Sequence, residues 1–504
     1  MSEVSTTEEN LSFFQRWMIA IAIMLATLMQ VLDTTIVNVA LPHVQGSLAA
    51  SPDETTWTLT SYLVASAIFM PLTGYWADRF GRKPYLLISI LGFTLSSALC
   101  GAATSIFQMV FFRLLQGIFG AGLVPLSQAI LTDIFPVKER GKAMAIWGMG
   151  VMVGPILGPS LGGYLTDVTS WRWTFYVNIP FGIISAFMVY RCVPDTFKKK
   201  RKLDWIGIIL LAMAVGSIQY VLDRGNQVDW FDALEIRITM LLGIIGLVGF
   251  LFYSLRSKTK TIIDLAIFKD RNFVLASLLL AVLGLGMYGT MVIQPQMLQG
   301  LLNYPVLTAG LMLAPRGIAS MFSMMLVSRL INRLDPRWLI STGILLGAEG
   351  IYLTTIHCSQ TISLIWLIIP LILQGLGLGL IFVPLSAVAF STLPATCRAE
   401  AAGVYSLIRT IGSSIGISIT ITFLTRHTQM AWNQLGGLLQ PYNPILIDYL
   451  RANYHLKPTD PQAATMLLNE LGKQSAMLAY MNTFAFITWS FIMMLPLVLL
   501  LKKR

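Results

Sequence analysis

Five ionisable side chains lie within long apolar stretches of this sequence. They are Asp33, Arg113, Arg316, Glu349 and Arg409. A charge that is held away from water costs several kcal/mol unless it is paired, hydrated or neutralised, so function is the first hypothesis for each of them. If all five are ionised, their sum is positive. The chemistry open to them is proton binding and the recognition of charged ligands.

Asp33 is the candidate proton carrier. A carboxylate removed from water binds a proton more readily than one in water, so Asp33 could load and release a proton near neutral pH. The alternative is a structural Asp that pairs two helices. Arg113 cannot shuttle protons, because a guanidinium stays protonated in proteins. We therefore assign Arg113 to tuning a carboxylate or a bound water.

A substrate cavity has a wider set of candidates. Arg316 follows Pro315, Arg409 lies midway along its apolar stretch, and either could face a cavity or pair with a carboxylate. Glu349 could instead extend its charge towards the outer face. The predicted cavity residues are Asp33, Asn38, Gln116, Arg316, Glu349 and Arg409. The excess of arginine predicts that anionic or weakly acidic hydrophobic compounds are exported as well as cations.

These residues are carried by apolar stretches of about 20 residues that recur along the chain. Of the 504 residues, 55% are apolar and 12% are charged, which is too few to cover an ordinary water-facing surface. We predict an all-α membrane protein with about fourteen transmembrane helices. The expected spans are 16–41, 55–77, 84–103, 106–132, 141–165, 173–191, 203–222, 237–255, 272–297, 306–331, 337–357, 362–390, 399–425 and 481–501.

The basic residues indicate the orientation. With the N-terminus inside, about 25 Lys and Arg lie on the inner side, including a cluster at 198–202, and about seven lie outside, so both termini are expected to be cytoplasmic. The net charge of +11 forms no basic face, which argues against nucleic acid. The first apolar stretch is too long for a cleavable signal. The four cysteines stand singly, without metal-like spacing, and predict packing roles.

An internal repeat divides the chain. A shift of 258 positions matches Gln116-Gly117 with Gln374-Gly375, Pro136 with Pro394, Arg140 with Arg398, Gly154 with Gly412 and Gly158 with Gly416. Two six-helix halves with an inserted helix pair, 6+2+6, would explain this pattern and would suit alternating access. The predicted domains are 1–191, the inserted hairpin 192–260, and 261–504 with a long outer loop at 427–480. Arg113 corresponds to Leu371, and no acid lies opposite Asp33.

One motif is highly specific. Residues 74–83 read G-x-x-x-D-R-x-G-R-K, where Gly74 permits a close helix approach and Gly81 a tight turn. This string resembles the signature loop of the major facilitator superfamily, which implies that fold. By that resemblance, Asp78 would latch the two halves on the cytoplasmic side. The latch residues are Gly74, Asp78, Arg79, Gly81 and Arg82. The second half has only a degenerate version at 332–337.

A second motif places small residues and prolines along one helix. It consists of Gly150, Gly154, Pro155, Gly158, Pro159 and Gly162. This spacing predicts a close, bendable helix contact and resembles the antiporter signature of drug exporters, although a purely structural helix crossing would also favour small residues. Residues 32–42 resemble the opening motif of fourteen-helix drug:proton antiporters. Arg113 resembles the arginine implicated in proton transfer in those antiporters, so Asp33 and Arg113 are expected to carry proton coupling. The outer loop with Asn443-Pro444 resembles that of EmrB-type multidrug efflux pumps of Gram-negative bacteria.

The resemblance implies a proton-coupled antiporter that exports hydrophobic drugs and toxic compounds across the bacterial inner membrane. A periplasmic adaptor protein and an outer-membrane channel would be its partners, with the outer loop as the contact. No cofactor is expected, because the proton gradient supplies the energy and no nucleotide-binding loop occurs. Neither an H-E-x-x-H nor a G-x-S-x-G string indicates an enzyme. A dedicated exporter of one metabolite, siderophore or amino acid, and more remotely a non-transporting sensor, are the alternatives.

Overall fold

The chain is helical throughout the part that the structure describes. This computed structural model describes residues 12–136, 139–195, 204–257, 263–331, 333–394, 397–440, 442–454, 457 and 460–502. Every regular element in these ranges is a helix, which confirms the predicted all-α class. The basic cluster at 198–202 lies outside the described residues.

Twelve of the described helical segments are long and apolar enough to cross a membrane. They are α2 (Phe13–Ser47), α5 (Arg82–Ala102), α6 and α7 (Ile106–Gly120, Leu123–Ile134), α9 and α10 (Trp173–Tyr176, Asn178–Cys192), α11 (Trp205–Arg224), α12 (Leu234–Arg256), α13 and η5 (Arg271–Gln296, Met297–Leu301), α14 (Val306–Leu330), α15 (Pro336–His357), α16 (Leu364–Ala389), α17 (Arg398–Gly436), and α19 and α20 (Pro461–Ile492, Leu495–Leu499).

Two further expected spans are interrupted helices. Helix α8 (Arg140–Val168) becomes a thirteenth span if its two parts, which meet at a 40° bend after Pro155, are counted together. The segment expected at 55–77 is helical in three pieces, α3 (Pro52–Phe69), η1 (Met70–Leu72) and α4 (Thr73–Phe80). It is not among the twelve, which are longer and more apolar helices. The described chain therefore has twelve or thirteen candidate spans.

Short polar side chains begin many of the helices. Ser and Asp accept hydrogen bonds from backbone N–H groups in the first turn, where no helical carbonyl is available. Such caps begin α2, α3, α6, α11, η4 (Leu265–Lys269), α13 and α15, and the residues are Ser12, Ser51, Ser105, Asp204, Asp264, Asp270 and Asp335. Two short turns, η2 (Gly225–Gln227) and η3 (Trp230–Asp232), connect α11 with α12.

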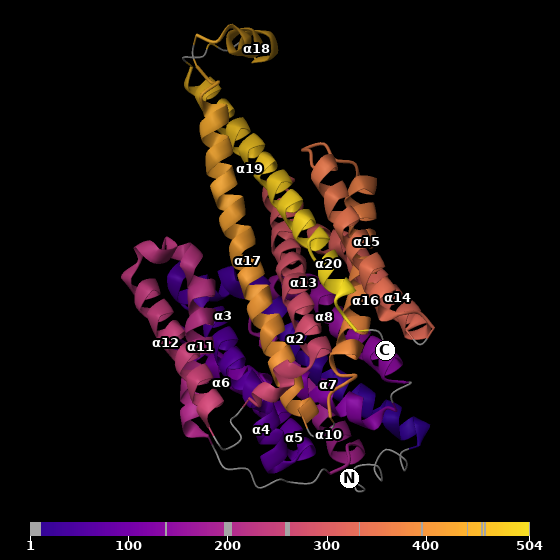
Figure 1. The fold of residues 1–504 in the computed structure, drawn as a ribbon. Coiled ribbons are helices and arrows are strands. Elements are labelled where there is room, and N and C mark those ends of the chain that lie inside the picture. Colours follow the sequence, from indigo (N-terminus) through magenta and orange to yellow (C-terminus); the bar gives the residue numbers. More distant parts are fainter. Residues whose placement is uncertain are drawn as a thin grey trace.

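The helices pack in two groups, with one further pair, α11 and α12, at the left edge of Figure 1. In the first group, α2 through α10, helix α2 packs on α8 and α10. In the second group, α13 through α20, helix α13 packs on α17. Helices α11 and α12 pack on each other, and α11 contacts both α3 and α17. The groups meet where α8 contacts α14 and where α17 contacts α4 and α7.

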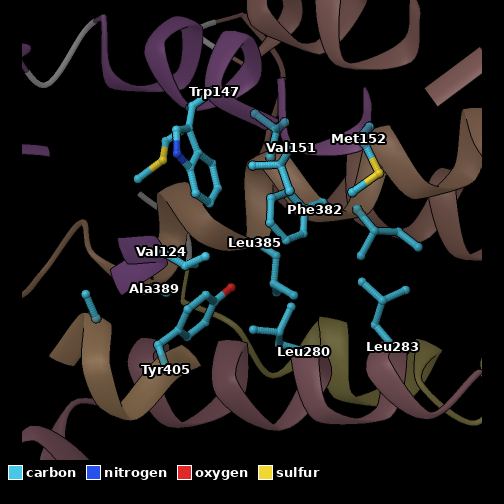
Figure 2. Close-up of a cluster of buried hydrophobic side chains, with 14 of the residues drawn as sticks. Val124, Trp147, Val151, Met152, Leu280, Leu283, Phe382, Leu385, Ala389 and Tyr405 are labelled. Carbon is cyan, nitrogen blue, oxygen red and sulfur yellow. The ribbon is translucent and has the colours of Figure 1, made fainter. Parts of the chain in front are cut away.

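Apolar side chains fill the contact between the two groups (Figure 2). Trp147 of α8 lies parallel to Phe382 of α16, with ring centroids 6.3 Å apart. Tyr405 of α17 and Leu280 of α13 belong to the same buried cluster. This cluster includes residues of both groups, so close apolar packing joins them here.

The segment expected to form a long outer loop at 427–480 is mostly helical. Helix α17 continues to Gly436, α18 covers Pro444–Tyr454 and α19 begins at Pro461. At about 1.5 Å per residue, the 39 residues of α17 span about 58 Å, nearly twice the thickness of a bilayer core. Pro444 and Pro461 each begin a helix, where proline is tolerated.

Helices α17 and α19 therefore form a projecting arm that carries α18 at its tip (Figure 1). A small apolar cluster of Leu446, Leu450 and Ala463 holds α18 against the start of α19. Large apolar side chains are nevertheless exposed on the arm, including Tyr442 and Ile445.

Candidate proton and substrate sites

A fully buried ion pair lies inside the first group of helices. Arg113 Nη1 is 2.6 Å from Asp33 Oδ2, and both side chains are inaccessible to solvent. Asp33 comes from α2 and Arg113 from α6, 80 residues further along the chain. The structure thus brings together the two residues that were predicted to carry proton coupling.

Two amides complete the site around the carboxylate. Gln116 Nε2 and Asn178 Nδ2 donate to Asp33 Oδ1 at 2.9 and 2.8 Å. Arg113 also donates to Gln116 Oε1 at 2.7 Å and, through Nε, to the carbonyl oxygen of Thr58 at 3.0 Å. With these partners the ionised pair can exist without water, because both charges are compensated and hydrogen-bonded.

Aromatic rings enclose the guanidinium. The centre of the Tyr62 ring is 4.4 Å from Arg113 Cζ, and that of Phe175 is 5.8 Å away. Both distances allow cation–π attraction. Ser97 connects this wall to the amides, because it accepts from Asn178 Nδ2 and donates to the carbonyl of Phe175.

A second buried polar cluster lies inside the second group of helices. Arg316 of α14 donates to Gln294 Oε1 at 3.1 Å and to Thr290 Oγ1 at 3.2 Å, both on α13. Gln294 Nε2 donates in turn to Gln374 Oε1 of α16 at 3.1 Å. The partners recorded for Arg316 in the described chain are all neutral.

The remaining cavity candidates do not join either cluster. Asn38 and Glu349 are exposed on α2 and α15. Arg409 is partly buried on α17 and lies close enough to Tyr405 to interact electrostatically. The structure therefore separates the six predicted cavity residues into two clusters and three isolated side chains, with Asp33 and Gln116 in the first cluster and Arg316 in the second.

The signature loop forms part of a contact between the two groups, at the lower end of Figure 1. Arg82, the first residue of α5, pairs with Asp133 of α7. Arg398, the first residue of α17, approaches the other oxygen of Asp133 at 3.1 Å. One carboxylate thus joins arginines from both groups, and we call this end of the molecule the closed end.

The other residues of the loop support that contact. Gly74 lies directly against the backbone of Glu400 in α17, where a larger side chain would collide. Gly81 has a φ of 89°, a conformation that favours glycine, and it directly precedes α5. Arg79 donates to the hydroxyl of Tyr75 at 2.7 Å. Asp78, the predicted latch, interacts electrostatically with Arg82.

Helix α8 packs its glycines on α2. Gly154 contacts Val31 and the backbone of Leu32, and Gly158 contacts Thr35. Gly150 and Gly162 continue the contact along Met24 and Ile36 of α2, and Thr35 Oγ1 donates to the carbonyl of Gly154 at 3.2 Å. Pro155 precedes the bend and Pro159 lies within it, where each proline removes a backbone donor. The close, bent contact predicted from the motif is present.

Sequence reasoning missed several residues of these sites, among them Asn178 and Asp133. Asn178 is a polar side chain within an apolar helix. The search for exceptional residues in apolar stretches considered only charged side chains and therefore passed over this amide. Asp133 lies three residues before Pro136, at the start of a loop predicted to face the inner side. Its partner Arg398 was recognised only as the repeat counterpart of Arg140. An acidic residue at the inner end of a span, where the neighbouring inner loops are rich in basic residues, could have indicated Asp133 as a partner for arginine.

The family follows from comparison with known proteins. Residues 23–417 match the model of the Major Facilitator Superfamily. The chain belongs to this superfamily. Its fold and family are those of transporters and not of enzymes, and about twelve apolar helices make this member a multi-pass membrane protein.

Two curated relatives from Escherichia coli cover most of this superfamily member. It is 36% identical to the probable multidrug resistance protein EmrY over 88% of this chain and 87% of that protein. It is 34% identical to the multidrug export protein EmrB over 95% of this chain and 94% of that protein. The resemblance to EmrB-type proteins is therefore confirmed.

A solved structure shows the same fold at low sequence identity. The proton:xylose symporter XylE superposes with a TM-score of 0.60 at 15% identity, covering 94% of this chain and 95% of that one. At this identity the likeness concerns the fold alone.

Proposed function

We propose that this chain is a proton-coupled antiporter that exports hydrophobic drugs and toxic compounds by alternating access. The names of its relatives EmrB and EmrY support multidrug export. The observation that carries proton coupling is the buried Asp33–Arg113 pair, because it is a titratable carboxylate sealed inside a membrane helix group.

Protonation of Asp33 would break the balance of charge in that site. A neutral carboxyl group leaves the guanidinium of Arg113 buried without a counter-charge, which is costly in a low-dielectric interior. Proton binding therefore favours a rearrangement that hydrates or moves Arg113. Asp33 lies on α2, and α2 packs on the glycines of α8. A movement of α2 would therefore displace α8, the bent helix that packs on α14 of the second group.

The proposed topology has fourteen spans in a 6+2+6 arrangement, with α3 to α4 and α8 completing the twelve. We propose that both termini and the closed end face the cytoplasm of a bacterial inner membrane, as the distribution of Lys and Arg favours. The contact at Asp133 then closes the cytoplasmic side, as an outward-facing state requires. The 1–191 and 261–504 halves would rock about the contact of α8 with α14.

The projecting arm is the proposed contact for a periplasmic adaptor protein, which would lead to an outer-membrane channel. Its length takes it well beyond the bilayer, and apolar side chains such as Tyr442 and Ile445 are exposed near its tip. Deleting residues 437–460 should leave transport in vesicles intact and remove resistance in cells. Equal resistance in cells carrying the deletion would exclude the arm as a necessary contact.

Transport in proteoliposomes with an imposed pH gradient tests the function. We expect the wild type to transport a panel of hydrophobic substrates. Asp33→Asn should lower the pH-driven accumulation of substrate about tenfold or more, the equivalent of one pH unit of driving force. Asp448→Asn is the matched control, because it removes an exposed acid of α18. Transport of a single metabolite would favour a dedicated exporter, and no transport would favour a sensor. Full pH-driven exchange by Asp33→Asn would exclude that residue from coupling.

A further inference from the structure

The two buried clusters occupy equivalent positions of the internal repeat. Gly117 of α6 packs on the carbonyl of Tyr62 and on Ala65 of α3. Its repeat counterpart, Gly375 of α16, packs on the carbonyl of Arg316 and on the side chain of Ala319 in α14 in the same way. Arg316 therefore stands where the first group has Tyr62.

The same comparison locates the counterpart of Asp33. Gly154 packs on Val31 of α2, and its repeat counterpart Gly412 packs on Ala281 of α13. One helical turn further, Gly158 packs on Thr35 and Gly416 on Leu285. These contacts place Leu283 opposite Asp33.

Arg113 likewise corresponds to Leu371. The second group thus replaces an acid and a base by two leucines, and puts one arginine in the place of a tyrosine. The first cluster has no net charge when ionised, and the second carries one positive charge.

That positive charge has no counter-charge in the described chain. Arg316 is 9% exposed, its Nε atom has no partner, and its other donors reach only amide, hydroxyl and carbonyl oxygens. No ion pair of the described residues includes Arg316. A buried unpaired guanidinium costs several kcal/mol, so an anion that reached it would be held strongly.

A small cavity lies beside the guanidinium. Arg316, Thr290 and Gln374 form its polar wall, and apolar residues including Leu283, Met287 and Phe491 form the rest. None of the residues that line it is acidic. The cavity therefore offers one positive charge, neutral hydrogen-bonding groups and an apolar wall.

We infer that this cavity in the second group binds one monovalent anion, with Arg316 as its counter-charge. The anion is either an inorganic ion such as chloride or the carboxylate head of an amphiphilic acid. Both present one negative charge to the guanidinium, and they differ in whether an apolar chain follows. As a binding site it stands independently of the proton coupling proposed for Asp33.

Thermal unfolding of the purified full-length chain tests this inference. Samples at equal ionic strength contain sodium chloride, sodium decanoate below its micelle concentration, or sodium gluconate, whose bulky polar chain does not suit the cavity. We expect chloride or decanoate to produce a saturable rise in Tm of about 2 °C over gluconate. Arg316→Gln should lose the rise. Arg237→Gln, which removes one exposed charge from α12, should keep it.

The variant also has an expected behaviour without the anion. Because glutamine removes an unpaired buried charge, Arg316→Gln should be at least as stable as the wild type in gluconate. A rise with chloride alone identifies an inorganic anion, and a rise with decanoate alone identifies an amphiphilic acid. Equal Tm values of the wild type in all three salts would overturn the inference, as would an undiminished rise in Arg316→Gln. A failure of proton-driven transport would leave this binding result unaffected.

Discussion

The two helix groups share a packing pattern and differ in buried charge. Gly117 and Gly375 bring a neighbouring helix to the same close distance, and Gln116 and Gln374 both take part in polar clusters. In the first group Asp33 and Arg113 compensate each other, whereas in the second Arg316 stands alone. The repeat therefore preserved the positions where backbones touch and changed the residues that titrate or attract ions.

On the proposals above, this difference gives the two halves separate tasks. A carboxylate with a built-in counter-charge can change its protonation state, and a lone guanidinium cannot. The first group is accordingly suited to protons and the second to anions. Exchanging residues between equivalent positions provides the means to test that assignment.

The largest expected effect comes from giving the first group the leucine of the second. Arg113→Leu leaves Asp33 buried without its partner and should lower the free energy of unfolding by about 3–5 kcal/mol. The double variant Asp33→Leu/Arg113→Leu, which copies Leu283 and Leu371, should recover most of that loss while remaining unable to couple protons. Unfolding of both purified variants in detergent measures the effect. Equal stability of Arg113→Leu and the wild type would show that the charge of Arg113 does not stabilise the buried Asp33 carboxylate.

An intermediate effect is expected where the two groups are alike. Gly117→Ala and Gly375→Ala each place a methyl group against a backbone carbonyl, of Tyr62 and Arg316 respectively. Both should destabilise the protein by about 1–3 kcal/mol, measured by thermal unfolding. Gly46→Ala is the control, because open space surrounds that position of α2, and it should cost nothing. A cost at only one of the two glycines would mean that the repeat does not preserve this contact.

The smallest effect is expected at the closed end. Asp133 corresponds to Ser391 in the repeat, so Asp133→Ser gives both groups a serine and releases Arg82 and Arg398. These pairs are partly exposed, so about 1 kcal/mol, or about a fivefold shift in population towards an open end, is expected. Distances between spin labels on α4 and α17 measure that population.

Glu139→Gln is the control for this comparison, because its weak pair with Arg16 stays within the first group. An unchanged distance distribution in Asp133→Ser would show that the Asp133 ion pairs do not hold the closed end together. The same shift in both variants would point to a general effect of charge.

Much of the fold was accessible from the sequence, for identifiable reasons. Apolar stretches of membrane-spanning length predicted most helices within a few residues, because lipid permits few alternatives to a helix. The expected spans at 399–425 and 481–501 were too short, because the mixed polar and apolar composition of 427–480 did not indicate that α17 and α19 extend into it. The bend of α8 was accessible from its prolines and glycines, whereas hydropathy alone does not report its 40° angle.

The sequence by itself determined which residues are exceptional: charges in apolar helices, glycines at repeated spacing and a specific loop. Only the tertiary structure decided their partners. Asp33 meets Arg113, Gln116 and Asn178 because α2, α6 and α10 present those faces to one another, whereas Arg316 meets only neutral groups. Residues 80 or more positions apart are brought together by the rotation and packing of whole helices, which depend on the close contacts of many small side chains.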